Sequence, residues 1–191
     1  MRDPDPGLPF GAHVFVDETK AGDYVMVATW VPSAQVAHTR RRLRALLRPR
    51  QARLHFQKMN RADRHRAIEL IAGLEVSAVV YRSPLRDARS ARCALLETIL
   101  GDAGDSRARR VVIERDDASL GLDLAVARAT AMPDDPVVTH LRSVDEPLLW
   151  VSDAAAWCVH RGGEWRTKVA PVLRERPSGD KAERKKKSEP G

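Results

Sequence analysis

A hairpin pattern near the N-terminus, over residues 12–31, most constrains how this chain can fold. Val14–Val16 is a short apolar run, and Asp17 and Glu18 follow it directly. The next five residues are typical of a tight turn, and Tyr24–Val31 is rich in β-branched and aromatic residues, which predicts an antiparallel return strand. A carboxylate that ends an apolar strand is costly to bury unless it is paired, hydrogen-bonded or bound to a metal. Asp17 is therefore the first candidate for chemistry, although the two acids can also simply open an exposed turn.

The rest of the chain alternates predicted helices and strands. Two helices are expected directly after the hairpin, within an insertion that spans residues 33–73. The remaining pattern predicts strands at 76–81, 110–114 and 136–141, and helices at 36–48, 61–72, 87–100, 121–131 and 148–160. An antiparallel hairpin followed by strand–helix units predicts an α/β fold, with a mixed sheet flanked by helices. A right-handed crossover places the strand at 110–114 parallel to the first strand and beside it.

Length and composition fit one globular domain. The chain has 191 residues, of which 31% are charged and 43% hydrophobic. We expect a flexible N-terminus at 1–11, a domain at 12–173 and a basic disordered tail at 174–191, where seven Lys or Arg residues face four Asp or Glu. No apolar stretch approaches the ~20 residues of a membrane span, and the N-terminus does not resemble a secretory signal. These features predict a cytoplasmic protein with no membrane partner and reduced cysteines, Cys93 and Cys158, and they leave the oligomeric state open.

The net charge of +7 and the calculated pI of about 9.9 favour a polyanionic partner such as nucleic acid. The alternative is that the excess charge only solvates the surface. The residues that we predict to contact nucleic acid are basic side chains of the insertion: Arg40, Arg41, Arg44, His55 and Lys58. The arginines are equally compatible with a solvated helix face, and His55 with a structural role.

Three further positions suggest chemistry at one edge of the sheet. Asp17 ends the first strand, Glu114 ends the predicted strand at 110–114, and Asp153 lies in an apolar helix between Trp150 and Trp157. Three carboxylates from three elements provide the oxygen ligands and negative charge that hard divalent cations require. Two such ions about 3.5–4 Å apart can activate water and stabilise the leaving oxygen in phosphodiester cleavage. The two tryptophans can stack on bases, but their spacing also fits the core.

Four short sequence motifs resemble those of the family called domain of unknown function 3800, which has a ribonuclease H-like fold. The motifs are FVDET, RLHF, VVIERDD and EPLLWVSDAAAW, and the resemblance covers roughly residues 12–165. It implies a ribonuclease H-like sheet and a nuclease scaffold, with Asp17, Glu114 and Asp153 as metal-facing catalytic acids that hold Mg²⁺ or Mn²⁺.

The sequence departs from the family pattern in two ways that concern the acids. The central-strand acid is Glu114 rather than aspartate, and the usual fourth acid has no clear match. Glu97, Asp87 and Asp116 are the candidates for the fourth acid, and we include Asp116 among the expected metal ligands. The resulting hypothesis is metal-dependent hydrolysis of nucleic acid. The alternatives are a non-catalytic nucleic-acid-binding or regulatory module on the same fold, and a protein that binds a partner through the insertion helices.

Overall fold

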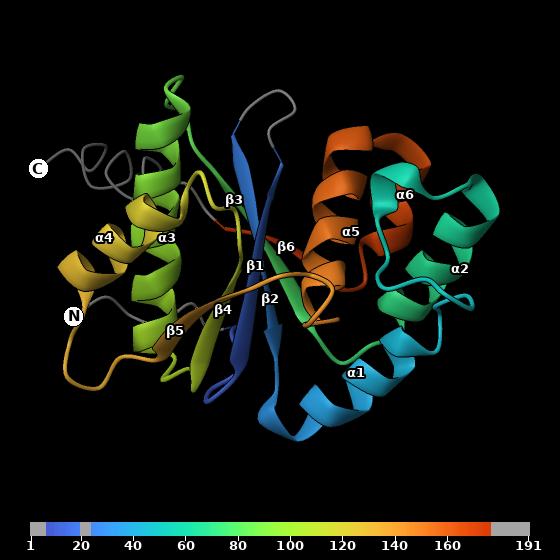
Figure 1. The fold of residues 1–191 in the computed structure, drawn as a ribbon, viewed down its shortest axis with the longest axis horizontal. Coiled ribbons are helices and arrows are strands. Elements are labelled where there is room, and N and C mark those ends of the chain that lie inside the picture. The colour runs from blue at the N-terminus through green and yellow to red at the C-terminus, as the bar shows by residue number, and fades with distance from the viewer. Residues whose placement is uncertain (1–6, 20–23, 177–191) are drawn as a thin grey trace, which may run out of the picture.

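The computed structural model describes residues 7–19 and 24–176, which form a six-stranded mixed sheet with helices on both faces (Figure 1). The strands are β1 (His13–Thr19), β2 (Val25–Val31), β3 (Ser77–Arg82), β4 (Arg110–Glu114), β5 (Val137–Leu141) and β6 (Leu173–Glu175). The helices are α1 (Val36–Arg44), α2 (Arg61–Ala72), α3 (Ala88–Asp105), α4 (Leu120–Thr130), α5 (Leu149–Arg161) and α6 (Gly163–Val169), with short 3-10 turns η1 (Ser33–Gln35) and η2 (Phe56–Lys58).

The strand order is β5-β4-β1-β2-β3-β6. Strands β1, β2 and β3 form an antiparallel meander, β4 and β5 run parallel to β1, and β6 runs parallel to β3. The predicted fold class is therefore confirmed: a mixed α/β sheet flanked by helices, with two helices inserted between β2 and β3. Because Val16 pairs with Ile113, the next residues of β1 and β4, Asp17 and Glu114, lie side by side where the pairing of these two strands ends.

Alternating side chains of β1 serve two separate cores. Val14 and Val16 pack with α3 and α4, whereas Phe15 packs with α5 and the inserted helices. Figure 1 shows this division, with α3 and α4 on one face of the sheet and α1, α2, α5 and α6 on the other. Since side chains alternate along a strand, Asp17 shares the face of Phe15 and points toward α5.

Buried hydrogen bonds fix α5 against the sheet. The Ser152 hydroxyl donates to the carbonyl oxygen of Phe15 at 2.8 Å and lies 2.7 Å from the Thr29 hydroxyl. Small side chains follow it in the helix, at Ala154–Ala156, and they let the helix lie close to β1, β2 and β3. The helix thereby brings its next residue, Asp153, to the edge of the sheet where β1 ends.

Two predicted helix ends are wrong. Helix α1 ends at Arg44 rather than before Pro49, because the chain turns after it and Leu46 and Leu47 pack individually on the core. Helix α3 does not stop at Gly101 but continues to Asp105. The apolar stripe continues to Ala103, which is fully buried, and this burial offsets the cost of about 1 kcal/mol that glycine imposes within a helix.

The C-terminal boundary also needs correction. Two elements after α5 were not predicted, α6 and β6, and β6 extends into the segment expected to be disordered from residue 174. Arg176 then donates two hydrogen bonds of 2.7 Å to the buried carboxylate of Asp102, which also accepts from the Tyr81 hydroxyl at 3.0 Å. The packed domain therefore reaches at least to Arg176. The rest of the expected tail, most of the expected flexible N-terminus and the hairpin turn lie outside the described residues.

Two smaller findings concern the described part of the chain. Cys93 and Cys158 are both free thiols. Over residues 7–19 and 24–176, no helix combines the length and the apolar character needed to cross a membrane.

Candidate active site

The structure brings together the three acids singled out in the sequence. Asp17 of β1, Glu114 of β4 and Asp153 of α5 line one cavity of about 560 Å³ at the edge of the sheet. Arg53 and His55, from the inserted segment before η2, line the same cavity. Three elements of the fold and the insertion thus meet at a single polar site.

Asp17 lies at the electrostatic centre of this cavity. Its pKa is raised well above the usual range, first by burial, and then by the negative charges of Glu114 and Asp153. A hydrogen bond of 2.7 Å from the backbone N–H of Glu18 to Oδ1 acts in the opposite direction. The side chain of Glu114 lies close enough to Asp17 to raise the pKa of Asp17 further through a hydrogen-bonding interaction. The site is therefore short of positive charge.

Asp153 is held by the inserted segment. Its Oδ2 accepts a hydrogen bond of 3.2 Å from the backbone N–H of Phe56. Burial raises the pKa of Asp153, whereas the Phe56 N–H and the nearby His55 lower it. The insertion between β2 and β3 thus orients an acid of the last long helix.

Arg53 is a site residue that the sequence reasoning missed. Its Nη1 lies 3.5 Å from Oε1 of Glu114 and also donates to the hydroxyl of Ser143. A sequence signal for Arg53 was present, because Arg53 begins the same RLHF motif that contains His55. Arg53 brings a half-exposed guanidinium to the rim of the acid cavity.

The chemistry of this donor set fits a hard divalent cation, because its ligands are carboxylate oxygens that repel one another when no cation is bound. Asp17 and Glu114 already lie within hydrogen-bonding reach of each other, while Asp153 is directed toward the Phe56 N–H. Within the described residues, no group of three or more His, Cys, Asp or Glu side chains is close enough to hold an ion in this conformation. The carboxylates of Asp17 and Glu114 therefore lie close together, whereas the carboxylate of Asp153 faces the Phe56 N–H.

The candidates for a fourth acid differ in their placement. Asp116 lines a neighbouring cavity of about 550 Å³ that also contains Asp17 and Glu114, and its carboxylate accepts from the N–H of Ala118 at 3.1 Å. Asp87 instead caps the start of α3, where hydrogen bonds from Ser90 lower its pKa. Glu97 is an exposed residue of α3. Of the three, Asp116 is the one that the structure places beside the acids.

The five basic residues predicted to contact nucleic acid are not grouped together. His55 lines the acid cavity, and Lys58 is an exposed residue of η2 nearby. Arg41 and Arg44 are exposed on α1, on the far side of the inserted segment. Arg40 donates from Nε to Oε1 of Glu146 at 2.9 Å, so it belongs to an ion pair that joins α1 to the segment before α5.

No family model matches the chain, and no curated protein matches it. Among solved structures, Bst-RNase HIII in complex with Mn²⁺ is similar, at 14% identity and a TM-score of 0.49, over 81% of this chain and 53% of that one. A mutant form of Bst-RNase HIII is similar at 13% identity and a TM-score of 0.44, over 85% and 52% of the two chains. This chain thus spans about half the length of the solved proteins that it matches.

The raised pKa of Asp17 predicts a specific pH dependence for Asp17→Asn. A carboxyl whose pKa is higher in the folded than in the unfolded protein costs stability at neutral pH, and this cost vanishes as pH falls through the folded pKa. We therefore expect Asp17→Asn to stabilise the metal-free protein at neutral pH by about 1 kcal/mol, or roughly 2–4 °C in Tm, and to lose this advantage toward about pH 4. Thermal melts in EDTA across this range measure the effect.

Asp134→Asn, in an exposed loop, is the matched control and should leave Tm unchanged at every pH. A stability difference for Asp17→Asn that is independent of pH would show that the Asp17 carboxylate is not electrostatically strained.

Proposed function

We propose that this protein hydrolyses phosphodiester bonds of nucleic acid, using Mg²⁺ or Mn²⁺ bound by Asp17, Glu114 and Asp153. The observation that supports this proposal is the convergence of three carboxylates, from β1, β4 and α5, on one cavity. The raised pKa values of Asp17 and Asp153 add to it, because burial and then neighbouring negative charge disfavour the ionised carboxylates, and a divalent cation would offset both effects. Membership of the domain of unknown function 3800 family is part of the same proposal and rests on the four sequence motifs alone.

The residues of the cavity have separate tasks in this proposal. Asp17 and Glu114 would hold the cation from the adjacent strands β1 and β4, and Asp153 would add an oxygen ligand from α5. A divalent cation bound there supplies the Lewis acidity that activates a water molecule toward phosphorus. Arg53 lies at the rim, where its guanidinium is suited to a phosphate oxygen of the bound strand. Asp116 is placed to contribute a ligand from the loop after β4.

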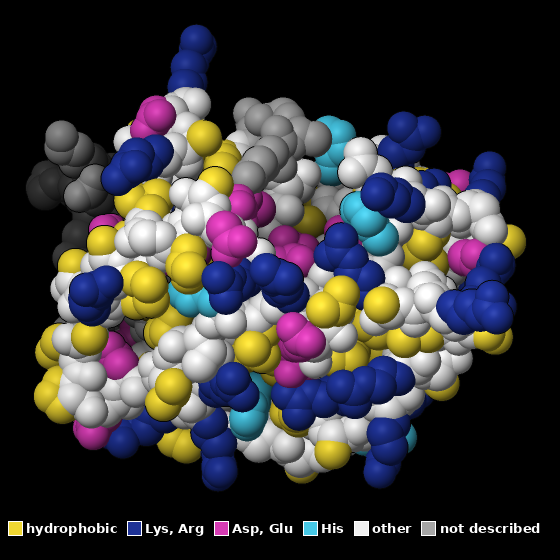
Figure 2. Space-filling model, in the orientation of Figure 1, with side chains coloured by type: hydrophobic (Ala, Val, Ile, Leu, Met, Phe, Trp, Pro, Cys, Tyr) yellow, Lys and Arg dark blue, Asp and Glu magenta, His cyan; other side chains and the backbone are white. Residues whose placement is uncertain are grey.

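The surrounding surface suits a polyanion. Figure 2 shows acidic side chains near the middle of one face, with Lys and Arg side chains distributed around them. With a net charge of +7, the chain attracts a nucleic-acid backbone electrostatically, while the acids remain available for cations that accompany it. Nucleic acid is therefore the partner that we propose.

A non-catalytic nucleic-acid-binding or regulatory module is the second candidate, and one observation favours it. The Arg53 guanidinium lies beside Glu114 and supplies positive charge to the acids. Among the described residues, moreover, no three potential ligands are gathered closely enough for an ion. In such a module, Arg53 would replace the cation, and the acids would serve to position basic side chains.

A cleavage assay distinguishes the two candidates. Labelled single strands and duplexes of DNA and RNA are incubated with Mg²⁺ or Mn²⁺ and the wild type, Asp17→Asn, Asp153→Asn or the control Asp134→Asn. We expect cleavage by the wild type and the control, and a loss of at least ~100-fold in both active-site variants with binding retained. Binding without cleavage of any substrate would favour the non-catalytic module, and cleavage that persists in Asp17→Asn would refute the proposed site.

A further inference from the structure

A second cavity opens beside the acid cavity, between α2, α5 and α6. It has a volume of about 460 Å³, and Arg61, Arg64, Arg161 and Trp157 are among the residues that line it. We call it the platform cavity. Gln57, Trp157 and His160 line both the platform cavity and the acid cavity, so the two adjoin along α5.

Helix α5 presents side chains to both cavities at a regular spacing. Asp153, Trp157 and Arg161 are each four residues apart, which places them on one face of the helix at steps of about 6 Å. A carboxylate, an indole ring and a guanidinium therefore follow one another along this face. A ligand that extends from the acid cavity along α5 meets Trp157 next.

The Arg64 guanidinium lies over the Trp157 ring, and the stacked pair forms a rigid surface in the platform cavity. The guanidinium carbon of Arg64 lies 4.6 Å from the centroid of the Trp157 ring. The guanidinium is fixed by two hydrogen bonds of 2.8 Å, from Nε to the carbonyl oxygen of Phe56 and from Nη2 to that of Gln57. The edge of Trp165 supports the Trp157 ring at 5.1 Å between centroids. Trp157 itself is half-buried, whereas Trp150 is 1% exposed in the core.

Exposed positive charge surrounds this flat surface. Arg61 has a side chain 71% exposed and pairs with the exposed Glu164 at the rim. Within the described part of the chain, the side chains of Arg161 and His160 have no hydrogen bond or ion pair, and both residues are exposed. The cavity thus combines an aromatic surface with cations that protein acids do not fully neutralise.

We propose that the platform cavity binds one nucleotide of a single-stranded nucleic acid, next to the phosphate that lies at the acids. The base stacks on the surface of Trp157 and Arg64, and Arg61 and Arg161 contact the backbone phosphates. A single strand is required because the bases of a duplex already stack on both of their faces. The volume falls within the range of small-ligand sites. The inference rests on the proposed function and assigns its substrate class.

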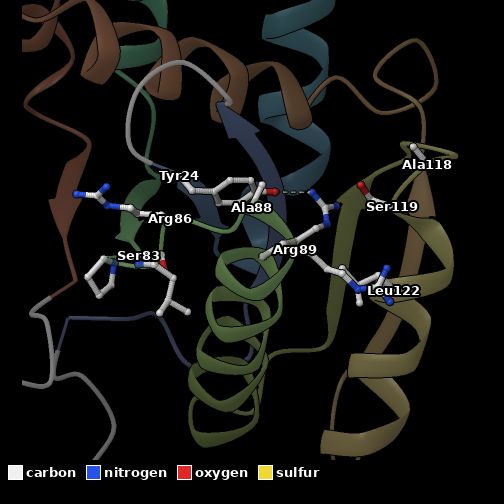
Figure 3. Close-up of a pocket in the computed structure, with 11 residues that line it drawn as sticks. Tyr24, Ser83, Arg86, Ala88, Arg89, Ala118, Ser119 and Leu122 are labelled. Carbon is white, nitrogen blue, oxygen red and sulfur yellow. Dashed lines mark hydrogen bonds between the residues drawn. The ribbon is translucent and has the colours of Figure 1, made fainter.

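A larger cavity on the other face of the sheet lacks the features that favour nucleotide binding in the platform cavity. It measures about 680 Å³ and lies between the N-terminal ends of α3 and α4, near the end of β3. Arg86 and Arg89 line it, but Figure 3 shows their side chains extending away from each other on either side of Tyr24. It shares no described lining residue with the acid cavity. These two arginines instead provide a matched control for charge.

Binding is measured in EDTA, without cleavage, by fluorescence anisotropy of labelled single-stranded DNA and RNA. Their duplexes and a single strand without bases are measured in parallel. We expect single strands to bind more tightly than duplexes, to lose affinity when the bases are absent, and to quench tryptophan emission. Trp157→Leu should weaken single-strand binding by roughly 5- to 100-fold, and Trp157→Phe should weaken it less.

The charge comparison uses Arg61→Ala/Arg161→Ala against Arg86→Ala/Arg89→Ala, which remove the same charge from opposite faces. The first pair should reduce affinity and lower the salt dependence by about 1.4 in log–log slope, and the second should have a smaller effect. Equal effects of the two pairs, or equal affinity of the wild type for duplex and single strand, would overturn the inference.

The binding measurements test the platform cavity, and the cleavage assay tests the proposed function, so either proposal can fail without the other. Single-strand preference that depends on the platform cavity, without cleavage under any metal, would support the inference and reject the hydrolase. Metal-dependent cleavage with no preference for single strands would support the hydrolase and reject the inference.

Discussion

Replacing Arg92 by methionine is expected to lower the free energy of unfolding by about 3–5 kcal/mol. Arg92 of α3 is 3% exposed, and it donates from Nε and Nη2 to the two carboxylate oxygens of Asp123 at 2.6 and 2.8 Å. Its Nη1 donates to Glu18 and to the Tyr24 hydroxyl. Without Arg92, the buried carboxylate of Asp123 would keep, among the described residues, only the His140 ring at 3.2 Å as a side-chain partner.

The lowered pKa of Asp123 supports this expectation. Burial on its own raises the pKa of Asp123, but hydrogen bonds from Arg92 and His140 reverse the effect and lower it. The resulting stabilisation is present at neutral pH and is lost as pH falls through the lowered folded pKa. In Arg92→Met, burial dominates, so the cost should shrink on acidification as Asp123 takes up a proton.

Denaturant unfolding at neutral pH measures the effect. Arg89→Met, one turn earlier on α3 and exposed, should change stability by no more than about 0.5 kcal/mol. The double variant Arg92→Met/Asp123→Leu should recover part of the loss, because it leaves no unpaired carboxylate. A cost below about 1 kcal/mol for Arg92→Met would show that the network does not hold α3 and α4 together.

The sequence predicted the fold well where local patterns and burial agree. The β-branched residues of Val25–Val31 mark a strand buried on both faces, and 110–114 was predicted exactly for the same reason. The failures occur where tertiary contacts override a local signal. Gly101 does not end α3, because the buried stripe continues beyond it. Strand β6 has only three residues, two of them charged, and it forms because the edge of β3 is available to pair with it.

The acids could be predicted from the sequence because each stands out from apolar neighbours in its own element. Parallel pairing of β1 and β4 was a topological inference, and it brings Asp17 and Glu114 to one edge. The RLHF motif drew attention to the segment that contains Arg53, but its contact with Glu114 and the contact of Arg64 with the Phe56 carbonyl could not be predicted, since both depend on how the inserted segment folds. Trp157 packs against the core, as its spacing predicted, and it also lies where the two cavities meet.

Divalent ions are expected to stabilise the protein by about 2.7 kcal/mol when the ion is present at 100 times its dissociation constant. The physical reason is that bound Mg²⁺ or Mn²⁺ removes the repulsion among Asp17, Glu114 and Asp153, which is absent from the unfolded chain. For a chain of this size, the increase in Tm is roughly 5–11 °C. Thermal melts with Mg²⁺, with Mn²⁺ and with EDTA measure it. Ca²⁺ tests whether the effect depends on ion size.

Asp17→Asn should abolish this gain, because the Asp17 carboxylate interacts electrostatically with both Glu114 and Asp153. Asp153→Asn should reduce it, and Asp87→Asn should retain it in full, since Asp87 caps α3 away from the cavity. A stabilisation that survives in Asp17→Asn would place the bound ion elsewhere on the protein.

Direct titration of Mn²⁺, with free ion measured by electron paramagnetic resonance, tests the acid site most directly. The account predicts saturable binding to the wild type and to Asp134→Asn, with the signal of free Mn²⁺ suppressed until the site is filled. It predicts that Asp17→Asn loses this binding while remaining folded. Absence of Mn²⁺ binding to the wild type at millimolar concentration, or unchanged binding to Asp17→Asn, would contradict it.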